Sequence, residues 1–308
     1  MSLLRVEHRR ALATAAVVLG AVATASNPVF VRLSDVGLIA SAFHRMFWAV
    51  PVIFVWVLLS RRGGGDSARM TSRDRVLLGL CGAFFAADLV ALHTSISLTY
   101  AANSILFLNA QPIYVVIAAW LLFGTSVSRR FVLAAAVAML GALMLVWQSA
   151  SFGGDYLLGD GLGVVAGLCY AGYILAAARL RDGRSSAVIN LWTCVVGAPL
   201  LLVAALAAGQ DVVPPTARDW SLMIALGVVS RALGQGLIVW GLAYLPSSFS
   251  SVALLVAPVA AAVFARLLLD EVLTVMQVAG MLVVLAGIYS AWRASFPAAI
   301  RAAAKPTP

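Results

Sequence analysis

Two charged side chains stand inside apolar stretches of this sequence, where a bilayer would surround them. Arg45 follows His44 in SAFHRMFW, within an apolar run over 36–59, and Asp88 stands in the next run, 76–96. A lone charge near mid-membrane costs about 3 kcal/mol or more, so it needs a partner, water or a function. At 1.5 Å per residue, Arg45 lies about 10 Å and Asp88 about 12 Å below the same surface. We therefore expect a structural ion pair between Arg45 and Asp88, with snorkelling of Arg45 or direct substrate or proton handling as alternatives.

A second arginine is placed still deeper in the sequence RALGQG. From the same helical rise, Arg231 lies about 16 Å below the same surface. Gln235 follows one helical turn later on the same face. An arginine at that depth must face a cavity, backbone carbonyls or Asp88. We expect Arg231 to take part in binding substrate.

Polar and aromatic side chains share one face of the run over 99–123. Asn103, Phe107, Gln111 and Tyr114 follow one another at helical spacing. A stripe of this kind lines a wet cavity or a helix interface more often than it faces lipid. It is therefore predicted to line the substrate path or a helix contact.

Further candidates for the cavity lining lie in two other runs. Asn27 precedes a mid-span proline that frees backbone carbonyls, and Tyr170 and Tyr173 share one helix face. A zwitterionic amino acid would suit these side chains, because its carboxylate needs a cation, its ammonium needs acceptors and its side chain needs an apolar or aromatic wall. Arg231 could supply the cation, Asp88 the acceptor, and the aromatic residues the wall for the side chain.

The composition is that of an integral membrane protein. Hydrophobic residues make up 63% of the chain and charged residues 11%, with a mean hydropathy of +1.00; soluble domains have about 45–50% apolar and about 25% charged residues. The net charge of +9 comes from basic residues in short loops, which indicates orientation in a lipid bilayer and no binding of nucleic acid.

Several chemistries are excluded or disfavoured by what the sequence contains. The cysteines at 81, 169 and 194 lie in apolar runs without metal-ligand spacing, so we expect packing roles, no metal and no cofactor. The chain has no GxxxxGK[ST] loop, and Lys305 is its only lysine, which excludes a built-in ATPase. We find no nucleophile–base or metal-ligand constellation typical of an enzyme.

Ten apolar runs are long enough to cross the hydrocarbon core, which takes about 20 residues. They are 11–33, 38–60, 76–96, 99–123, 130–148, 158–178, 187–208, 220–241, 247–269 and 273–293. This predicts an all-α integral membrane protein with ten transmembrane helices. The N-terminal stretch resembles a signal peptide, but we expect it to be retained because its apolar run continues past Pro28.

The basic residues predict the orientation of these ten helices. One side carries Arg5, Arg9, Arg10, Arg61, Arg62, Arg69, Arg73, Arg75, Arg129, Arg130, Arg179, Arg181, Arg184, Arg293, Arg301 and Lys305. The other side carries only Arg32, Arg218 and Arg266. Because cytoplasmic loops are enriched in Lys and Arg, both termini are predicted to be cytoplasmic.

The two halves of the chain resemble each other at an offset near 146 residues. Pro112 and Gly141 match Pro258 and Gly287, and Ser104 matches Ser250. We therefore expect two five-helix repeats, over 1–150 and 151–308. Five is odd, so the second repeat must be inverted in the membrane, an arrangement typical of secondary transporters that bind substrate near the midplane.

Two long patterns identify a resemblance to a known family. YAANSILFLNAQPIYVVIAAWLLFG covers 100–124, and YLPSSFSSVALLVAPVAAAVFARLLLDE covers 244–271. With the single arginine of the second span, they resemble the ten-span form of the drug/metabolite transporter superfamily, which has two EamA domains. Glu271 fits the acidic position of that pattern, whereas Thr125 departs from it in the first copy. The resemblance covers nearly the whole chain and, among its members, is greatest to YddG-type aromatic amino-acid exporters.

The resemblance implies a multi-pass transporter of the bacterial inner (plasma) membrane. We expect a secondary transporter that exports small metabolites, most of all aromatic or neutral amino acids, by alternating access. Alternatives are an exporter of other metabolites or drugs, a passive pore, or a carrier of sugar phosphates or nucleotide sugars. The last is disfavoured because phosphates need several cations and only two arginines lie within spans. Protons as a coupling partner stay open, with Asp88, His44 and His93 as the candidate carriers.

Overall fold

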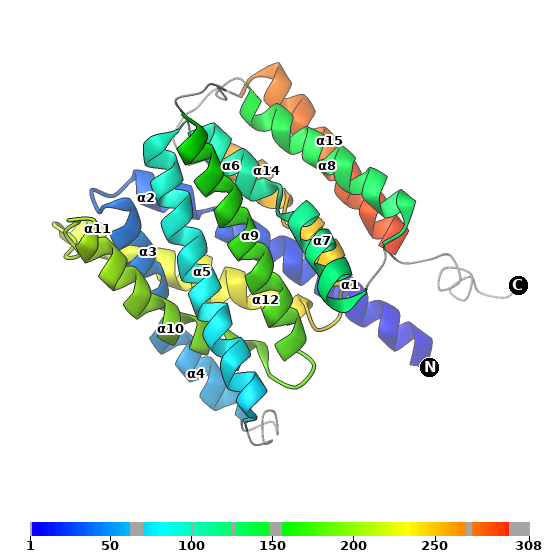
Figure 1. The fold of residues 1–308 in the computed structure, drawn as a ribbon, viewed down its shortest axis with the longest axis horizontal. Coiled ribbons are helices and arrows are strands. Elements are labelled where there is room, and N and C mark those ends of the chain that lie inside the picture. The colour runs from blue at the N-terminus through cyan, green and yellow to red at the C-terminus, as the bar shows by residue number, and fades with distance from the viewer. Residues whose placement is uncertain are drawn as a thin grey trace, which may run out of the picture.

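The computed structural model describes residues 2–61, 70–99, 101–124, 127–147, 156–268 and 273–295. Every regular element in these ranges is a helix. Nine helical segments of this described part are long and apolar enough to cross a membrane. The tenth expected span is α8 (Arg129–Val146). The predicted all-α membrane fold is therefore confirmed (Figure 1), and the nine candidate spans together with α8 are consistent with the predicted ten.

Several spans are built from more than one helix. The first half contains α1 (Ser2–Thr24), α2 (Asn27–Arg32), α3 (Leu38–Phe47), α4 (Ala49–Arg61), α5 (Ser72–Leu98), α6 (Ala101–Asn109), α7 (Gln111–Phe123) and α8. The second half contains α9 (Leu157–Leu180), α10 (Ser186–Ala207), α11 (Ala217–Ala225), η3 (Leu226–Gln235), α12 (Gly236–Gly241), α13 (Ser247–Ala253), α14 (Val256–Leu268) and α15 (Val275–Ser295).

The breaks within the spans occur at corresponding places in the two halves. The fourth span is interrupted at Ala110, before Pro112, and the ninth is interrupted after Ala253, before Pro258. Proline removes a backbone N–H and clashes with the preceding turn, which explains why a helix restarts at both places. Interrupted helices near mid-membrane are how many transporters expose backbone groups to a substrate.

The packing of the helices repeats in the same way. The α5 helix packs on α9, and its counterparts η3 and α12 pack on α1. The α10 helix packs on α3 and α4, and α8 packs along α15, as Figure 1 shows at one edge of the bundle. If each helix is replaced by its counterpart in the other repeat, the same pairs of helices are obtained. Two five-helix repeats related by inversion are expected to pack in this way. Their predicted boundary, between 150 and 151, lies outside the described residues, as do Thr125, Asp270 and Glu271.

The paired glycines allow α8 and α15 to approach each other closely. A Cβ added to Gly141 would lie 2.5 Å from the backbone N of Val284, and one added to Gly287 would collide with the backbone of Ala138. Small residues at such contacts let membrane helices pack backbone to backbone. The sequence repeat therefore marks this interface directly.

A second repeat, Thr-x-x-Asp, ties the halves together. Thr71 and Asp74 begin α5, and Thr216 and Asp219 begin α11, 145 residues further on. In both pairs the aspartate N–H donates to the threonine hydroxyl at 3.1 Å, which satisfies a free N–H of the helix N-terminus. Each aspartate then reaches across to the other repeat.

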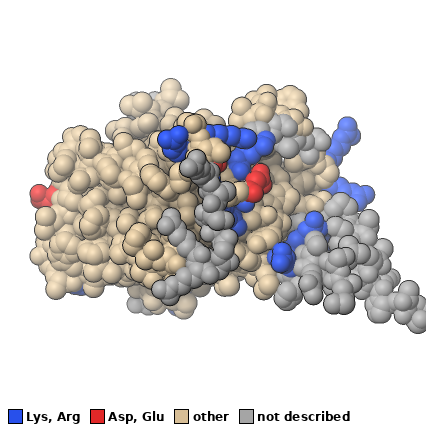
Figure 2. All heavy atoms as spheres, turned by 90° about the horizontal axis from the view of Figure 1, so that it is seen from below, with Lys and Arg blue, Asp and Glu red and all other residues tan. Residues whose placement is uncertain are grey.

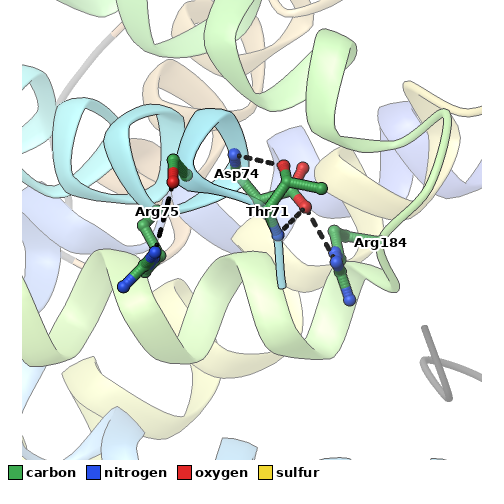
Figure 3. A network of polar contacts seen from close by, with 5 residues as sticks. Thr71, Asp74, Arg75 and Arg184 are labelled. Carbon is green, nitrogen blue, oxygen red and sulfur yellow. Dashed lines mark hydrogen bonds and ion pairs between the residues drawn. The ribbon is translucent and has the colours of Figure 1, made fainter. Parts of the chain in front are cut away.

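At the start of α5 the cross-link is an ion pair, drawn in Figure 3. Arg184, in the connection between α9 and α10, donates from Nη2 to Asp74 Oδ2 at 2.8 Å. The same carboxylate oxygen accepts the Thr71 N–H at 2.9 Å. We name Thr71, Asp74 and Arg184 the α5 latch.

At the start of α11 the partner is a backbone group of the first repeat. Asp219 Oδ1 accepts the N–H of Asp35, in the connection between α2 and α3, at 3.1 Å. Thr216 donates its hydroxyl to the other oxygen of Asp219 at 2.5 Å. We name Thr216, Asp219 and Asp35 the α11 latch. Because the repeats are inverted, the two latches lie at opposite ends of the bundle.

Figure 2 shows the face of the molecule seen from below in Figure 1, on which several basic side chains gather and acidic side chains are few.

The tight contact between α8 and α15 gives a test of the fold. We expect Gly287→Ala to lower Tm, because its Cβ would overlap the α8 backbone and overpacking costs about 1–3 kcal/mol. Gly161→Ala is the matched control, since a Cβ there meets nothing within 4 Å and alanine favours helix over glycine. Thermal unfolding of the two purified variants in detergent makes the comparison. Equal Tm values would show that α8 and α15 do not pack as described.

Candidate functional site

The centre of the bundle holds two buried arginines that pack on the same aromatic ring. Phe85, on α5, is 1% exposed. The Arg231 Cζ lies 4.2 Å from the centroid of this ring, and the Arg45 Cζ lies 5.6 Å from it. Both distances are within the about 6 Å range of cation–π attraction. The Phe85 ring therefore offsets part of the cost of burying both guanidiniums.

Arg231 has few partners for a buried cation. Its side chain is 0% exposed, and its Nε donates to Cys194 Sγ at 3.3 Å. The Nη1 and Nη2 atoms have no hydrogen-bond partner in the described part of the protein. Because a buried charge without a partner is strongly destabilising, these two nitrogens mark a position where an anionic group would be stabilised.

Arg45 and Asp88 are brought near each other on α3 and α5. Both side chains are buried, and they interact electrostatically. No hydrogen bond or ion pair of the described residues joins them, and Arg45 Nε and Asp88 Oδ1 are both without a partner. The ion pair expected between Arg45 and Asp88 stays a prediction.

Two tyrosines and a glutamine complete this group. Gln235 Nε2 donates to Tyr173 Oη at 3.3 Å and to Tyr170 Oη at 3.4 Å. The Tyr173 ring meets Phe85 edge-on, with centroids 4.9 Å apart. The structure therefore gathers seven side chains from four spans, which we name the central cluster: Arg45, Phe85, Asp88, Tyr170, Tyr173, Arg231 and Gln235.

Local structure explains how the charged members are positioned. Arg231 and Gln235 lie on η3, a ten-residue π-helix within a longer span, and π-helical turns are rare and frequent at functional sites. Arg45 lies on α3, whose N-terminus is capped from the other repeat: Gln210 Oε1 accepts the N–H groups of Ile39 and Ala40 at 3.0 Å each. The cap satisfies two free donors of the helix end.

The polar stripe of the fourth span faces α9. Phe107 lies against Gly163, and Tyr114 lies against Gly167, where an added Cβ would be 2.5 Å from the Tyr114 ring. Gln111 begins α7, is 5% exposed and has no partner for Oε1. The stripe is therefore a helix interface with one unsatisfied amide, one of the two environments expected from the sequence.

Asn103, at the start of this stripe, belongs to a separate hydrogen-bond group. Its Nδ2 donates to Asp160 Oδ1 at 3.1 Å, and Thr99 Oγ1 donates to the same oxygen at 2.8 Å. Ser95 donates to the Gly159 carbonyl at 2.6 Å. These bonds join α5 and α6 to the first turn of α9, so we assign Asn103 to linking the repeats.

The remaining predicted residue, Asn27, is the first residue of α2 and is half-buried. No hydrogen bond in the described structure joins it to the central cluster. His44 is packed, with Nε2 2.6 Å from the Val212 carbonyl oxygen. Sequence reasoning missed Phe85, Cys194 and Asp160 as parts of these groups. Asp160 could have been found from the sequence, because it is an acidic residue close to the start of the predicted span at 158. Phe85 and Cys194 could not, because they do not stand out in an apolar chain.

The side chains of the central cluster are of the kinds that recognise charged small molecules. They offer cationic donors, one carboxylate, two phenol groups and aromatic faces. Among the described residues, no group of three or more His, Cys, Asp or Glu could hold a metal ion. What the arrangement supports is reversible recognition of a polar solute inside a membrane.

A model of the EamA-like transporter family matches residues 11–147 and 157–293. The chain belongs to the EamA-like transporter family. The two matched segments are the two repeats, and the resemblance to the drug/metabolite transporter superfamily is confirmed. The chain is accordingly a multi-pass membrane transporter and not an enzyme.

Relatives of this EamA-like transporter are named as transporters or exporters. An uncharacterized transporter of Archaeoglobus fulgidus is 28% identical over 279 residues, which cover 91% of this chain and 96% of the relative. The pseudopaline exporter CntI of Pseudomonas aeruginosa is 27% identical over 187 residues, covering 61% of this chain and 63% of the relative. A solved structure titled "Crystal structure of protein" matches with a TM-score of 0.78 at 15% identity, covering 95% of this chain and 99% of that one, which shows the same fold.

The role of Phe85 can be tested through stability. We expect Phe85→Leu to lower the free energy of unfolding more than Phe131→Leu does, because both remove a buried ring but only Phe85 contacts two guanidiniums. Desolvated cation–π contacts contribute about 2 kcal/mol each, so the difference should exceed about 1 kcal/mol. Denaturation of both variants in the same detergent measures it, and an equal decrease in both would contradict the arrangement.

Proposed function

We propose that this transporter exports amino acids from the cytoplasm, and that it binds them at the central cluster. One observation carries the proposal: the Nη1 and Nη2 atoms of buried Arg231 have no partner in the described part of the protein, in the same cluster as a buried carboxylate, Asp88. Guanidinium and carboxyl side chains gathered in one cluster of an apolar interior match the two charged groups of an amino-acid backbone. Export is also the activity named for the pseudopaline exporter that the chain resembles.

An amino acid would be held at three points. Its α-carboxylate would accept hydrogen bonds from Arg231 in the bidentate geometry that guanidinium favours. Its ammonium would donate to Asp88 Oδ1, which has no partner in the described protein. Its side chain would contact the rings of Phe85 and Tyr170, so aromatic and neutral side chains are accommodated. The resemblance to YddG-type exporters supports the same substrates.

Alternating access would follow from the inverted repeats. The α5 latch and the α11 latch close opposite ends of the bundle with corresponding Thr-x-x-Asp sequences. Both latches are formed in this structure, so opening the transporter to one side would require breaking the latch at that end while the other stays formed. Each latch therefore controls access from one side of the membrane.

The uneven distribution of Lys and Arg along the sequence supports an orientation. One side of the predicted bundle carries most of these residues, and such sides are cytoplasmic by the positive-inside rule. Both termini are then cytoplasmic and the α5 latch closes the cytoplasmic side. We place the protein in the inner membrane of a bacterium on the basis of its family resemblance. A coupling to protons stays a prediction.

Transport by the purified protein tests the substrate. Liposomes loaded with the twenty amino acids should release a subset of them faster than protein-free liposomes, as read by mass spectrometry. Arg231→Gln should reduce this efflux at least about tenfold, since an ion-paired hydrogen bond of this kind contributes about 1.5–3 kcal/mol. Arg266→Gln, which removes an exposed arginine at the end of α14, is the control and should transport normally.

Two results of this transport assay would contradict the proposal. If folded protein releases no amino acid above the protein-free rate, the substrates are not amino acids. If Arg231→Gln transports as the wild type does, the central cluster is not the binding site. Repeating the efflux with an imposed proton gradient shows whether proton movement accelerates export.

The α5 latch can be tested through the reactivity of Cys81, which is fully buried two turns along α5. We expect Asp74→Asn to speed its labelling by a membrane-impermeant maleimide in inside-out vesicles, because this substitution removes the ion pair with Arg184. Asp182→Asn, an exposed residue of the same connection as Arg184, is the matched control. Equal labelling rates in both variants and the wild type would show that the latch does not close this face.

A further inference from the structure

The central cluster contains three buried ionisable side chains, of which two are arginines. Arg45, Asp88 and Arg231 are 7%, 3% and 0% exposed. Arg45 interacts electrostatically with Asp88, which attracts it, and with Arg231, which repels it. The cluster therefore holds one carboxyl group for two guanidiniums. In a low-dielectric interior an excess charge is costly, so a bound solute that carries the missing negative charge is favoured.

The atoms without partners show how such a solute would be held. Among the fully buried atoms of the described chain, the donors without a partner in this cluster are Nη1 and Nη2 of Arg231 and Nε of Arg45. Asp88 Oδ1 is a fully buried acceptor without a partner. The cluster thus presents a positive, a negative and a second positive position. A complementary solute presents a carboxylate, an ammonium and a second carboxylate.

A neutral amino acid would leave one of these positions unmatched. When its ammonium binds Asp88 and its carboxylate binds Arg231, Asp88 can no longer compensate Arg45 fully. Phe85 relieves only part of this cost, because the Arg45 Cζ lies 5.6 Å from its centroid, further than the Arg231 Cζ at 4.2 Å. A carboxylate on the substrate side chain would supply the counter-charge that Arg45 then needs.

We propose that the transporter prefers amino acids whose side chain carries a carboxylate over the corresponding amides, with Arg45 as the residue that recognises the second carboxylate. The inference rests on the proposed function and extends it from the backbone to the side chain of the substrate. Neutral and aromatic amino acids still bind, but more weakly than an acidic amino acid of similar size. Arg45 then determines specificity, while Arg231 serves every substrate.

Glutamate and glutamine provide the test, because they are nearly isosteric and differ by one charge. Proteoliposomes are loaded with equal concentrations of L-glutamate and L-glutamine, and the efflux of both is followed by mass spectrometry. Valinomycin with equal potassium on both sides holds the membrane potential at zero, so that net charge alone does not drive either solute. We expect initial glutamate efflux at least tenfold faster than glutamine efflux, and the same order for aspartate against asparagine.

Variants then assign the preference to a residue. Arg45→Gln should lower glutamate efflux to the glutamine rate while glutamine efflux continues, and Arg266→Gln should leave the ratio unchanged. Arg45→Lys retains the charge and should retain part of the preference, which makes it the second variant if Arg45→Gln does not fold. An unchanged ratio in folded Arg45→Gln would overturn the role of Arg45.

The possible failures are distinguishable. Equal efflux of glutamate and glutamine above the protein-free rate overturns this inference and leaves amino-acid export standing. Faster efflux of glutamine overturns the inference in the same way. If neither these two nor any of the other amino acids leaves the liposomes faster than without protein, the proposed function itself is wrong.

Discussion

The guanidinium of Arg231 is a full positive charge, 0% exposed, inside a bundle built mostly of apolar residues. Burying an ion of this size costs several kcal/mol even after relaxation, so the surrounding structure must offset that cost. Phe85 offers its ring face, Cys194 accepts from Nε, and the π-helix η3 carries the residue at its depth. The two terminal nitrogens remain unsatisfied by the described residues, and a solute that accepts hydrogen bonds from them stabilises the buried charge further.

The two repeats surround this charge with matching local structure. Corresponding breaks in the fourth and ninth spans, corresponding helix pairs and corresponding Thr-x-x-Asp starts give the two halves the same local structures in opposite orientations. A state in which the halves exchanged their conformations would therefore have a similar energy, because each of these interactions in one half has a counterpart in the other. The exception is charge: the α5 latch is an ion pair with Arg184, whereas the α11 latch uses a backbone N–H.

The candidate site was predictable in part. Depth along an apolar run depends only on residue number and helical rise, so Arg45, Asp88 and Arg231 could be placed at similar levels without a structure. Whether the first two touch depends on the rotation of α3 and α5 about their axes and on side-chain rotamers, which no periodicity reports. Phe85 escaped notice because an apolar ring in an apolar helix is the expected residue, and only its two arginine neighbours make it unusual.

The sequence by itself determined the number of spans, the inverted relation of the halves and the family. These depend on length, hydropathy and an odd number of crossings, and membrane insertion responds to such properties one segment at a time. The tertiary structure decided which polar atoms meet and which are left without partners. A hydrogen bond requires heavy atoms within about 3 Å in a favourable direction, and only the packed arrangement of helices from both repeats sets those distances.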